Sequence, residues 1–511
     1  MLTKVFGSAI YGVSAQTITI EVNVDTGVGY YLVGLPDNAI KESNYRIGTA
    51  LLNTGYKIPG KKITINMAPA DLHKEGSAYD LTIAMGILAA SEQIKSEGIS
   101  DYLIMGELAL DGMLRPIKGV LPIAVQARDE GFRGFILPKQ NAKEAAIVNG
   151  LEVIGVENMM DVIEFFDKNK SIEPVQIDIQ KEFYEQLNLF PFDFADVKGQ
   201  ENVKRALEIA AAGGHNIILI GPPGSGKTML AKRIPSILPP LTLEEALETT
   251  KIHSVAGKLG EKTSLMTVRP FLSPHHTISN VGLVGGGSYP QPGEISLAHN
   301  GVLFLDELPE FQRTVLEVMR QPLEDREVTI SRAKFTVTYP SSFMLVASMN
   351  PSPSGYFPDD PKNTSSQLEM QRYMNKISGP LLDRIDLHIE VSPVPFDDLS
   401  AERNGERSLE IRKRVMKARE IQTKRYEHLK NTHYNAQIGP KQLDEFCELD
   451  ETGKKLIKSA MEKLNLSARA YDRILRVART IADLEESEGL KSSHIAEAIQ
   501  YRSLDREGWG V

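Results

Sequence analysis

The stretch NIILIGPPGSGKTML, residues 216–230, constrains the fold more than any other part of the chain. Its apolar start predicts a buried strand, its glycine-rich middle a tight loop, and its end the first turn of a helix. The stretch satisfies the pattern G-x-x-x-x-G-K-[ST], in which backbone N–H groups cradle phosphates, the lysine reaches the β- and γ-phosphates and the hydroxyl binds Mg²⁺. We therefore predict a nucleotide site in a parallel α/β sheet, formed by Gly221, Pro222, Pro223, Gly224, Ser225, Gly226, Lys227 and Thr228.

Two further apolar stretches predict strands that end in polar residues. GVLFLDEL (301–308) contains Asp306 and Glu307 after its apolar run, and FMLVASMNP (343–351) contains Asn350. Ligands bind at the carboxyl ends of strands in open α/β sheets. Asp306 is expected to hold Mg²⁺ through water, Glu307 to orient and deprotonate the attacking water, and Asn350 to sense the γ-phosphate. In isolation, paired carboxylates more often belong to a solvated turn and Asn-Pro is a turn signal; the phosphate loop favours the catalytic interpretation.

The composition is that of an ordinary globular protein with several domains. At 511 residues the chain has room for about three domains. Its hydrophobic content of 41% and charged content of 24% are typical of soluble proteins. The apolar runs fall far short of the ~20 residues that span a membrane, and the first residues lack the apolar core of an export signal, so we expect a cytoplasmic protein without a membrane partner. The single cysteine, Cys447, excludes disulfide frameworks and thiolate zinc sites within one chain.

The order of strand and helix patterns predicts a multidomain α/β protein. Residues 1–166 mix alternating strands with helical periodicity, and residues 167–191 form a polar, proline-containing linker. Residues 192–395 alternate short apolar strands with helices, which is typical of a parallel sheet. Residues 396–511 contain three clear amphipathic or charged helical stretches.

A basic hairpin is predicted in a chain whose formal net charge is -9. The stretch TISRAKFTVTYP (329–340) alternates like a strand pair, and its short turn carries Arg332 and Lys334. Because binding follows the local field rather than the total charge, such a tip is able to contact the phosphates of a nucleic acid. The alternative is an exposed hairpin whose charges prevent edge-to-edge pairing with another chain.

Two longer motifs carry a family resemblance. The stretches PFLSPHHTISNVGLVGGGSYPQPGEISLAHNGVLFLDELPEF (270–311) and ISGPLLDRIDLHIEV (377–391) resemble the YifB/ComM family of magnesium-chelatase-like AAA+ ATPases. The resemblance covers nearly the whole chain, and it implies an AAA+ core, a C-terminal α-helical lid, ATP and Mg²⁺ as cofactors, and a homo-hexameric ring. At matching positions Arg384 resembles the arginine finger that reaches the neighbouring subunit's nucleotide. Arg469 resembles the lid arginine that senses the γ-phosphate, with Arg473 as the near alternative.

The resemblance also implies a role for the basic hairpin. In related rings the hairpin before the first sensor projects into the central pore, so that every copy would add Arg332 and Lys334 to one positive ring. Phosphate contacts of this kind are independent of sequence and sensitive to salt. The resemblance thus implies DNA in the pore as the partner, single-stranded or branched and bound without sequence preference.

The chain departs from the family pattern in the loop after Asn350. Many members of the family carry cysteines there, arranged like a four-thiolate zinc site. This chain has Ser352, Ser354, Asn363 and Ser365 at the aligned positions. Hydroxyls and amides are poor zinc ligands. We therefore expect no zinc, and we predict that hydrogen bonds and prolines hold the loop.

The N-terminal region resembles the proteolytic domain of Lon proteases, an α+β fold. The segments HKEGSAYDLTIAM and GELALDGMLRPIKGVLPIAVQA align with those that hold the serine and the lysine of that family. The aligned positions here are Ala78 and Leu121; Ser77 lies one residue away, and Lys118 lies three residues early. A Ser-Lys dyad needs both groups within hydrogen-bond reach. We therefore predict a Lon-like fold without protease chemistry, which serves as a DNA-guiding or assembly collar.

Three functions remain open for this chain. The family resemblance favours an ATP-driven DNA motor that promotes branch migration or helicase action in homologous recombination and natural transformation. The alternatives are a chelatase-type ATPase that remodels a protein partner for metal insertion, and an ATP-dependent protease or unfoldase. The basic hairpin and the fused Lon-like domain favour the motor. A chelatase motor would work with separate large subunits. A protease would need a Ser-Lys dyad, which this chain lacks at the aligned positions.

Overall fold

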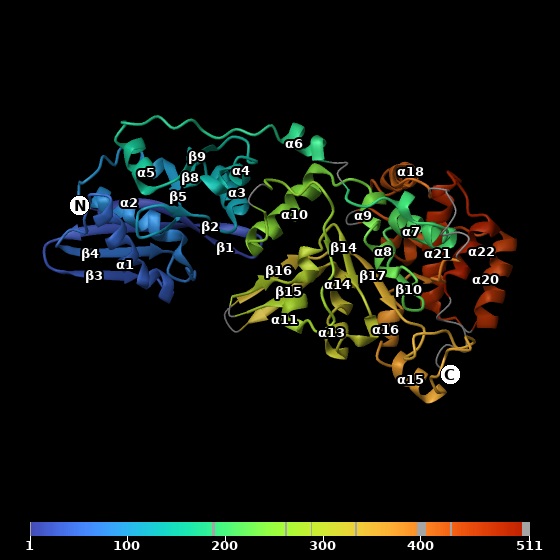
Figure 1. The fold of residues 1–511 in the computed structure, drawn as a ribbon. Coiled ribbons are helices and arrows are strands. Elements are labelled where there is room, and N and C mark those ends of the chain that lie inside the picture. The colour runs from blue at the N-terminus through green and yellow to red at the C-terminus, as the bar shows by residue number, and fades with distance from the viewer. Residues whose placement is uncertain are drawn as a thin grey trace. The chain divides into compact units, whose positions relative to one another are not determined.

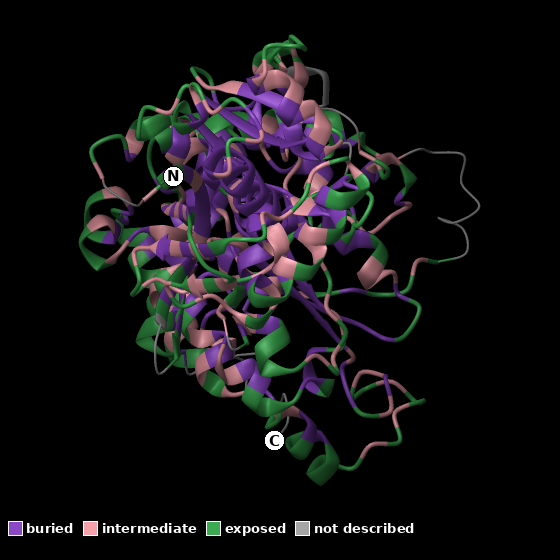
Figure 2. Ribbon diagram, turned by 90° about the vertical axis from the view of Figure 1, so that its left-hand side faces the viewer, coloured by how far each residue is buried: buried purple, intermediate pink, exposed green. Residues whose placement is uncertain are grey.

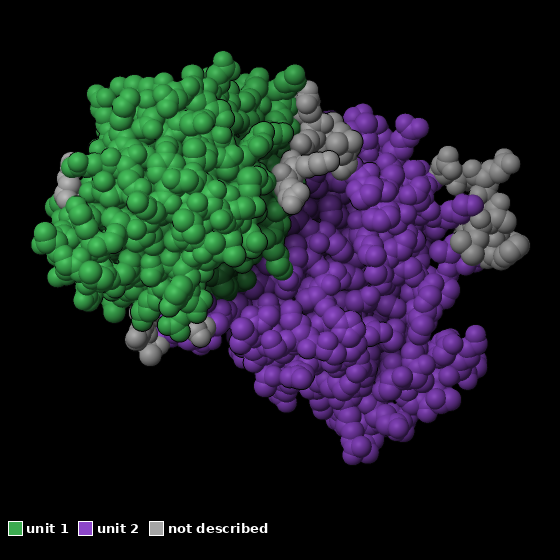
Figure 3. Space-filling model, turned by 60° about the vertical axis from the view of Figure 1, so that its left-hand side comes forward, with its two compact units in different colours: residues 1–186, 243–267, 290–292 green, residues 187–242, 268–289, 293–511 purple. Residues whose placement is uncertain are grey.

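The computed structural model describes residues 2–186, 190–260, 263–287, 289–332, 335–395, 405–429, 432–464 and 466–502. The chain forms two compact units, each with its own main sheet (Figure 1). Each unit is assembled from several segments of the chain, and Figure 3 shows the two units in different colours. Unit 1 comprises Met1–Gln186, Leu243–Thr267 and Pro290–Pro292, and unit 2 comprises Leu187–Thr242, Val268–Tyr289 and Gly293–Val511.

Unit 1 contains a mixed β-sheet. The strands of unit 1 as a whole are β1 (Leu2–Tyr11), β2 (Ser14–Asp25), β3 (Gly29–Val33), β4 (Lys62–Ala68), β5 (Tyr102–Ile104), β6 (Glu107–Leu108), β7 (Leu114–Arg115), β8 (Gly134–Pro138), β9 (Glu152–Val156) and β13 (Gln291–Pro292). Among the described residues the main sheet has seven strands in the order β3-β4-β2-β1-β5-β8-β9. Strands β1, β2 and β4 pair antiparallel, and β5, β8 and β9 extend the sheet in parallel. Residues of β2 alternate between buried and more accessible, as its alternating sequence predicts.

The helices of unit 1 are α1 (Asn38–Asn53), α2 (Asp80–Ala90), α3 (Val120–Asp129), α4 (Lys139–Ala145), α5 (Met159–Phe166), α6 (Ile179–Gln186) and α10 (Leu243–Ala256). Helix α2 is buried along its whole length because its sequence is apolar on nearly every side. Asp80, its one charged residue, accepts hydrogen bonds from Arg46 Nε at 2.8 Å and Nη2 at 2.9 Å. Burial raises the pKa of Asp80, and the ion pair with Arg46 opposes that rise.

One helix of unit 1 comes from the middle of the chain. Helix α10 interrupts the segments that form unit 2 and packs against α3. The N–H of Gly119, the residue before α3, donates to the carbonyl of Ser254 at 3.0 Å. The Ser254 hydroxyl donates to the carboxylate of Glu144, which also accepts the N–H of Leu121 at 2.9 Å. The amino-terminal unit therefore contains a helix that follows the phosphate loop in the sequence.

Unit 2 contains a parallel sheet. The strands of unit 2 as a whole are β10 (Ile217–Ile220), β11 (Phe271–Leu272), β12 (Gly285–Gly286), β14 (Val302–Leu305), β15 (Glu327–Arg332), β16 (Phe335–Pro340), β17 (Met344–Met349) and β18 (Leu387–Glu390). In the described part of unit 2 the main sheet has the order β11-β14-β17-β10-β18, and its neighbours pair in parallel. Every residue of β10, β14 and β17 is buried, as expected for a parallel sheet whose two faces are covered.

The helices of unit 2 are α7 (Glu201–Gly213), α8 (Lys227–Ala231), α9 (Ile234–Ile237), α11 (Asn280–Val284), α12 (Glu294–Leu297), α13 (Arg313–Glu317), α14 (Arg320–Asp325), α15 (Gln367–Met374), α16 (Gly379–Leu382), α18 (Ser408–Arg425), α19 (Pro440–Phe446), α20 (Glu451–Leu464), α21 (Ala468–Leu484) and α22 (Ser492–Gln500). The carboxyl-terminal helices share one apolar core with the sheet, which includes Val415 and Ile481 from the helices and Ile217 and Leu387 from the strands. In Figure 2 the strands and the helices beside them are largely buried. None of the described helices has the length and apolar character that crossing a membrane requires.

Candidate functional site

The phosphate loop lies at the carboxyl end of β10 and leads into α8, so the strand, loop and helix predicted for this stretch are all present. Its glycines occupy positions that a side chain would disturb. A Cβ on Gly221 would come within 2.2 Å of the Val391 carbonyl oxygen, and Gly226 has a φ of 91°. Gln200, just before α7, donates from Nε2 to the Ser225 carbonyl at 2.9 Å and fixes the loop from the other side.

The Lys227 ammonium group joins the loop to the neighbouring strand β17. Its Nζ donates to the carbonyls of Gly221 at 2.6 Å and Pro222 at 3.0 Å, and to Oδ1 of Asn350 at 3.2 Å. Burial lowers the pKa of Lys227, and the negative charges of Asp306 and Glu307 oppose that shift. The structure thus brings the loop lysine, the two acidic residues and the asparagine together at one edge of the sheet.

Asp306 is fixed by two hydroxyl groups. Thr228 Oγ1 donates to Oδ2 of Asp306 at 2.8 Å, and the Ser348 hydroxyl donates to Oδ1. The Ser348 oxygen also accepts the N–H of Glu307 at 3.2 Å. Ser348 is a buried residue of β17 that the sequence motifs did not single out. The available signal was a lone hydroxyl in the apolar stretch FMLVASM, two residues before Asn350.

Thr228 and Asp306 fit a Mg²⁺ ion that a nucleotide also helps to hold. Mg²⁺ takes oxygen ligands and usually binds through one or two protein groups, substrate phosphates and water. The two side-chain oxygens that lie 2.8 Å apart match that pattern. Within the described ranges, no group of three or more His, Cys, Asp or Glu side chains could hold a metal ion by itself.

Glu307 occupies a backbone position with a positive φ of 55°, which is uncommon for a residue with a side chain. Its carboxylate is 56% exposed and lies beside His276, with Oε2 3.7 Å from Nδ1. The His276 ring packs against His275, with centroids 4.1 Å apart, and edge-on against Phe311 at 6.4 Å. His276 is a second residue of the site that the motifs did not single out, although the histidine pair in SPHHTIS was a visible signal.

Arg384 lies at the other end of the sheet from the phosphate loop. Strand β18 runs parallel to β10, with Leu387 opposite Ile217 at the start of both strands. Arg384 precedes Leu387 by three residues and therefore lies at the amino ends, whereas the phosphate loop follows the carboxyl end of β10. At ~3.3 Å per residue, β10 alone separates the two by about 10 Å. The guanidinium group donates to the Pro380 carbonyl and to the carboxylate of Glu324.

Both candidate lid arginines lie at the same end of the sheet as the predicted arginine finger. They are residues of α21. Arg473 donates to Oδ1 of Asp386 at 2.6 Å, and Arg469 donates to Oδ2 of Asp383 at 3.0 Å. The Arg473 side chain is 20% exposed and that of Arg469 is 71% exposed. Burial acts to raise the pKa of Asp386, but Arg473 and a hydrogen bond with His215 outweigh it and hold the pKa below its usual range.

The hairpin is present as the sequence predicts, and part of its tip is described. β15 and β16 pair antiparallel, with Arg332 opposite Phe335. Arg332 is exposed, and its Nε donates to the carbonyl of Gly287 at 3.3 Å. Lys334 lies outside the described residues.

The four polar residues at the aligned cysteine positions meet in one hydrogen-bond network. The Ser354 hydroxyl lies 2.9 Å from Ser352 Oγ and donates to Asn363 Oδ1 at 2.7 Å. The Ser354 N–H donates to Ser365 Oγ at 3.0 Å. Ser352 Oγ also accepts the N–H of Tyr356 at 3.2 Å. The hydrogen bonds that the sequence predicts for this loop are therefore present.

In unit 1 the residues at and beside the aligned dyad positions have different surroundings. The Ser77 hydroxyl donates to the carboxylate of Glu107. The Lys118 side chain is exposed and lies over Gly257, whose φ is 65°. Leu121, at the aligned lysine position, is fully buried. The Ser77 hydroxyl is thus bonded to a carboxylate rather than to a lysine.

Three models of magnesium-chelatase domains match successive parts of this chain. They are "Subunit ChlI of Mg-chelatase" over residues 20–141, "Magnesium chelatase, subunit ChlI" over residues 193–399, and "Magnesium chelatase, subunit ChlI C-terminal" over residues 405–502. Competence protein ComM of Haemophilus influenzae is 45% identical over 509 residues, which cover 99% of this chain and 98% of that protein. The chain belongs to the YifB/ComM family.

Other relatives agree with this membership. The YifB protein of Escherichia coli (strain K12) is 44% identical over 509 residues, which cover 99% of this chain and 98% of that protein. Lon protease 2 of Bacillus subtilis is 34% identical over 160 residues, or 29% of this chain and 28% of that protein, so the likeness to Lon is partial. As a member of the YifB/ComM family the chain is a magnesium-chelatase-like AAA+ protein, with a mixed α/β architecture, a parallel core sheet and a helical carboxyl-terminal part.

Proposed function

We propose that this chain is an ATPase that works as a homo-hexameric ring. ATP binds at the phosphate loop, Thr228 and Asp306 hold Mg²⁺ with it, and Glu307 deprotonates the attacking water. Lys227 contacts the β- and γ-phosphates, and Asn350 senses the γ-phosphate. The hydrogen bonds of Lys227 with Asn350 and of Thr228 with Asp306 support this assignment, because they bring the required groups to one edge of the sheet.

One observation carries the proposal of a shared site. The arginines expected to stabilise the transferred phosphoryl group lie at the amino ends of the strands, away from the phosphate loop of their own chain. An arginine finger has to reach the γ-phosphate to act. This position supports the proposal that Arg384, together with Arg469 or Arg473, completes the site of a neighbouring subunit rather than its own. Copies that each donate a finger to the next close into a ring.

We further propose that the ring moves on single-stranded or branched DNA held in its central pore. The exposed Arg332 on the hairpin supports this, as does the similarity to a protein named for competence. Contacts from such a tip go to phosphates and carry no sequence preference. The proposed process is branch migration or helicase action in homologous recombination and natural transformation, in the cytoplasm and without a membrane partner.

The test of the ring mixes two inactive variants. Arg384→Ala should keep ATP binding and lose hydrolysis, since an arginine finger contributes ~10³–10⁵ in rate; Glu307→Gln should do the same because it lacks the base. In a mixed ring, an Arg384→Ala subunit keeps its own base and receives a finger from its Glu307→Gln neighbour, so hydrolysis should partly return. A mixture that stays as inactive as its components would show that the finger does not act in trans.

The test of the DNA motor compares ATP turnover with and without four-way or forked DNA. The proposal expects DNA to raise kcat and the ring to move the junction at saturating ATP. A rate of ATP turnover that stays the same with every DNA structure would exclude the DNA motor.

A second candidate is a chelatase-type ATPase that remodels a protein partner. It is supported by the three chelatase-domain matches and by the magnesium-chelatase 38 kDa subunit of Cereibacter sphaeroides, which is 23% identical over 180 residues, or 32% of this chain and 53% of that protein. DNA-independent turnover would favour this candidate. The protease alternative receives no support from Ser77, whose hydroxyl is bonded to Glu107.

A further inference from the structure

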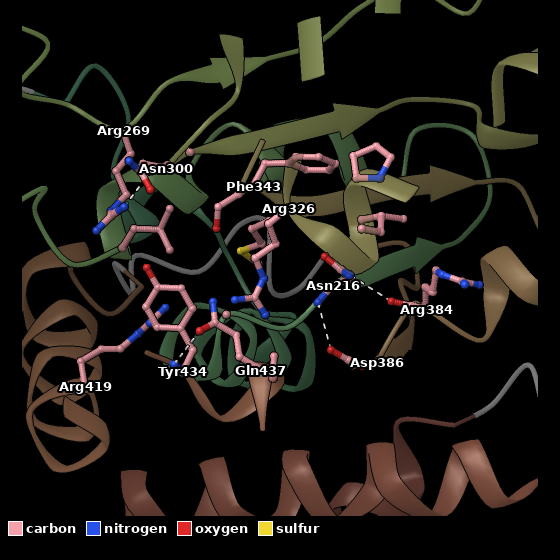
Figure 4. A pocket seen from close by; sticks show the side chains of 18 of the residues that line it. Asn216, Arg269, Asn300, Arg326, Phe343, Arg384, Asp386, Arg419, Tyr434 and Gln437 are labelled. Atoms are coloured by element: carbon pink, nitrogen blue, oxygen red, sulfur yellow. Dashed lines mark hydrogen bonds between the residues drawn. The ribbon is translucent and has the colours of Figure 1, made fainter. Parts of the chain in front are cut away.

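A hydrogen-bonded loop joins β17 to α15 in unit 2. We call its residues 351–365 the serine loop, because three of the four side chains in its hydrogen-bond network are serines. It follows the carboxyl end of β17, as the phosphate loop follows that of the parallel strand β10. The pocket whose wall includes Asn216, Arg384 and Asp386 lies at the opposite, amino ends of the strands (Figure 4). The serine loop therefore shares its end of the sheet with the nucleotide site.

Gly355 brings the serine loop into contact with the phosphate loop. The residue is buried and has a φ of 92°, in the left-handed region that glycine adopts easily. A Cβ at this position would lie 3.1 Å from Cδ and 3.2 Å from Cγ of Pro223. Those distances are shorter than the ordinary separation of about 3.5–4.0 Å between carbon atoms in contact, so the glycine backbone packs directly against the proline ring. The serine loop thus limits where Pro223 can move.

The tip of the phosphate loop is exposed and rich in glycine. Gly224 and Gly226 have φ values of 79° and 91°. Among the described residues beyond its chain neighbours, no atom lies within 4 Å of a Cβ built at Gly224. Glycine has more conformational entropy to lose than other residues when a loop becomes ordered. A contact that orders the loop before the nucleotide arrives lowers the cost of binding, and the packing of Gly355 on Pro223 is a contact of this kind.

The side-chain network fixes the backbone that presents Gly355. Ser354 Oγ donates to Asn363 Oδ1 at 2.7 Å, so its one hydroxyl proton is used there. In the 2.9 Å contact between the hydroxyls of Ser352 and Ser354, Ser352 is therefore the donor. Ser352 Oγ also accepts the N–H of Tyr356 at 3.2 Å, and the Ser352 carbonyl accepts the N–H of Gly355 at 3.0 Å. One chain of hydrogen bonds thus holds the residues on both sides of Gly355.

The residues just before the serine loop contact the phosphate loop as well. Asn350 Oδ1 accepts a hydrogen bond from Lys227 Nζ at 3.2 Å, and the Asn350 carbonyl accepts one from the Tyr373 hydroxyl of α15 at 3.3 Å. The N–H of Gly221 donates to the carbonyl of Met349 at 3.2 Å. The start, the tip and the end of the phosphate loop are therefore each attached to the end of β17 or to the loop that follows it.

We propose that the serine loop positions the phosphate loop for a nucleotide, with Ser352 and Ser354 as positioning residues that act through Gly355 on Pro223. This inference rests on the nucleotide site proposed above. The network sets nucleotide affinity through the shape of the phosphate loop, and not by contact with the reacting atoms. Its polar side chains thereby have a role in binding beyond holding their own loop together.

The test measures the Kd of ADP with Mg²⁺ by calorimetry on the full-length protein. Ser354→Ala removes two side-chain hydrogen bonds and should raise the Kd about tenfold, a loss that two neutral hydrogen bonds can supply. Ser352→Ala breaks the same network and should raise the Kd by a similar factor. Thr364→Ala is the matched control, because Thr364 is an exposed residue of the same loop outside the network described above. It should keep the Kd of the unmodified protein.

A double-mutant cycle tests the route by which the network acts. If it acts through Pro223, Pro223→Ala should raise the Kd, and adding Ser354→Ala should raise it little further. Fully additive effects of the two substitutions on log Kd would overturn this route. In steady-state assays of Ser354→Ala the KM for ATP should rise with the Kd. The kcat at saturating ATP should change less, because Ser348 keeps its contacts with Asp306 and Glu307.

The possible failures of this proposal and of the proposed function can be told apart. An unmodified protein that does not bind ADP would refute the nucleotide site, and the positioning role with it. Binding of ADP with the same Kd in Ser354→Ala and Thr364→Ala would overturn the positioning role alone and leave the nucleotide site intact. Because calorimetry with ADP needs neither hydrolysis nor DNA, a failure of the motor proposal would leave its result unchanged.

Discussion

Replacing Ser348 by alanine tests what holds the acidic end of β14. The buried hydroxyl donates to Asp306 and accepts the N–H of Glu307, so the substitution removes two hydrogen bonds at once. A hydrogen bond to a charged group contributes about 1.5–3 kcal/mol, and we expect Ser348→Ala to cost about 2 kcal/mol. Since 1.36 kcal/mol is a factor of ten, local opening around β17 should become roughly 30-fold more frequent.

Two measurements report on this substitution. Hydrogen exchange should show protection of the β17 amides reduced by about 30-fold. Steady-state turnover should show kcat reduced by about tenfold or more, because a displaced base loses part of the 10²–10⁴-fold that acid–base catalysis contributes. The KM for ATP should change little, since Lys227 and the phosphate loop keep their own contacts.

Ser341→Ala is the matched control. Ser341 is as fully buried as Ser348, but its hydroxyl has no hydrogen-bond partner among the described residues. Removing a buried hydroxyl that lacks a partner should leave stability unchanged or improve it. If Ser348→Ala and Ser341→Ala show the same hydrogen-exchange protection of β17 and the same kcat, the reasoning is refuted.

Four further predictions concern single features. Glu307→Gln should bind ATP and stop hydrolysing it, and normal turnover in a coupled assay would contradict its role as base. His276→Ala should lower kcat without changing ATP affinity, with His276→Gln closer to the unmodified protein; equal kcat in all three would remove His276 from the site. Changing Arg332 and Lys334 together to alanine should alter the free energy of unfolding by no more than about 0.5 kcal/mol and should weaken DNA binding. The slope of log affinity against log salt should become shallower by about 0.9 per lost phosphate contact on duplex DNA. An unchanged slope would show that the hairpin tip is a solvated edge that does not contact DNA. Ser77→Ala should change neither ATP turnover nor DNA binding, and an ATP-dependent proteolysis that vanishes in this variant would contradict the loss of protease chemistry.

The local parts of the candidate site could be predicted because their geometry is encoded in contiguous residues. The strand, loop and helix around Lys227 lie within residues 216–230, and the motif fixes their order. Asp306 and Asn350 each follow a short apolar strand, and parallel strands bring their carboxyl ends to the same edge. Their positions beside the loop therefore follow from the sheet type.

The long-range partners could not be predicted in the same way. Ser348 bonds to a carboxylate 42 residues away, and Ser254 bonds to Glu144 across 110 residues. Periodicity indicates which face of an element is buried, but not which other element covers it. The position of Arg384 at the far end of the sheet likewise depends on the direction in which β18 pairs with β10, which the motif around it does not contain.

The origin of α10 has a consequence for anyone who divides this protein into parts. Its buried residues, among them Ala246, Ile252 and Val255, belong to the amino-terminal unit although they are encoded after the phosphate loop. A truncation that removes residues 1–186 would expose these apolar side chains to water and leave Ser254 without Glu144. Such a fragment is expected to aggregate. The amino-terminal unit therefore cannot be removed by cutting the chain after residue 186. Its contribution to the protein's activity has to be measured by point substitution in the intact chain.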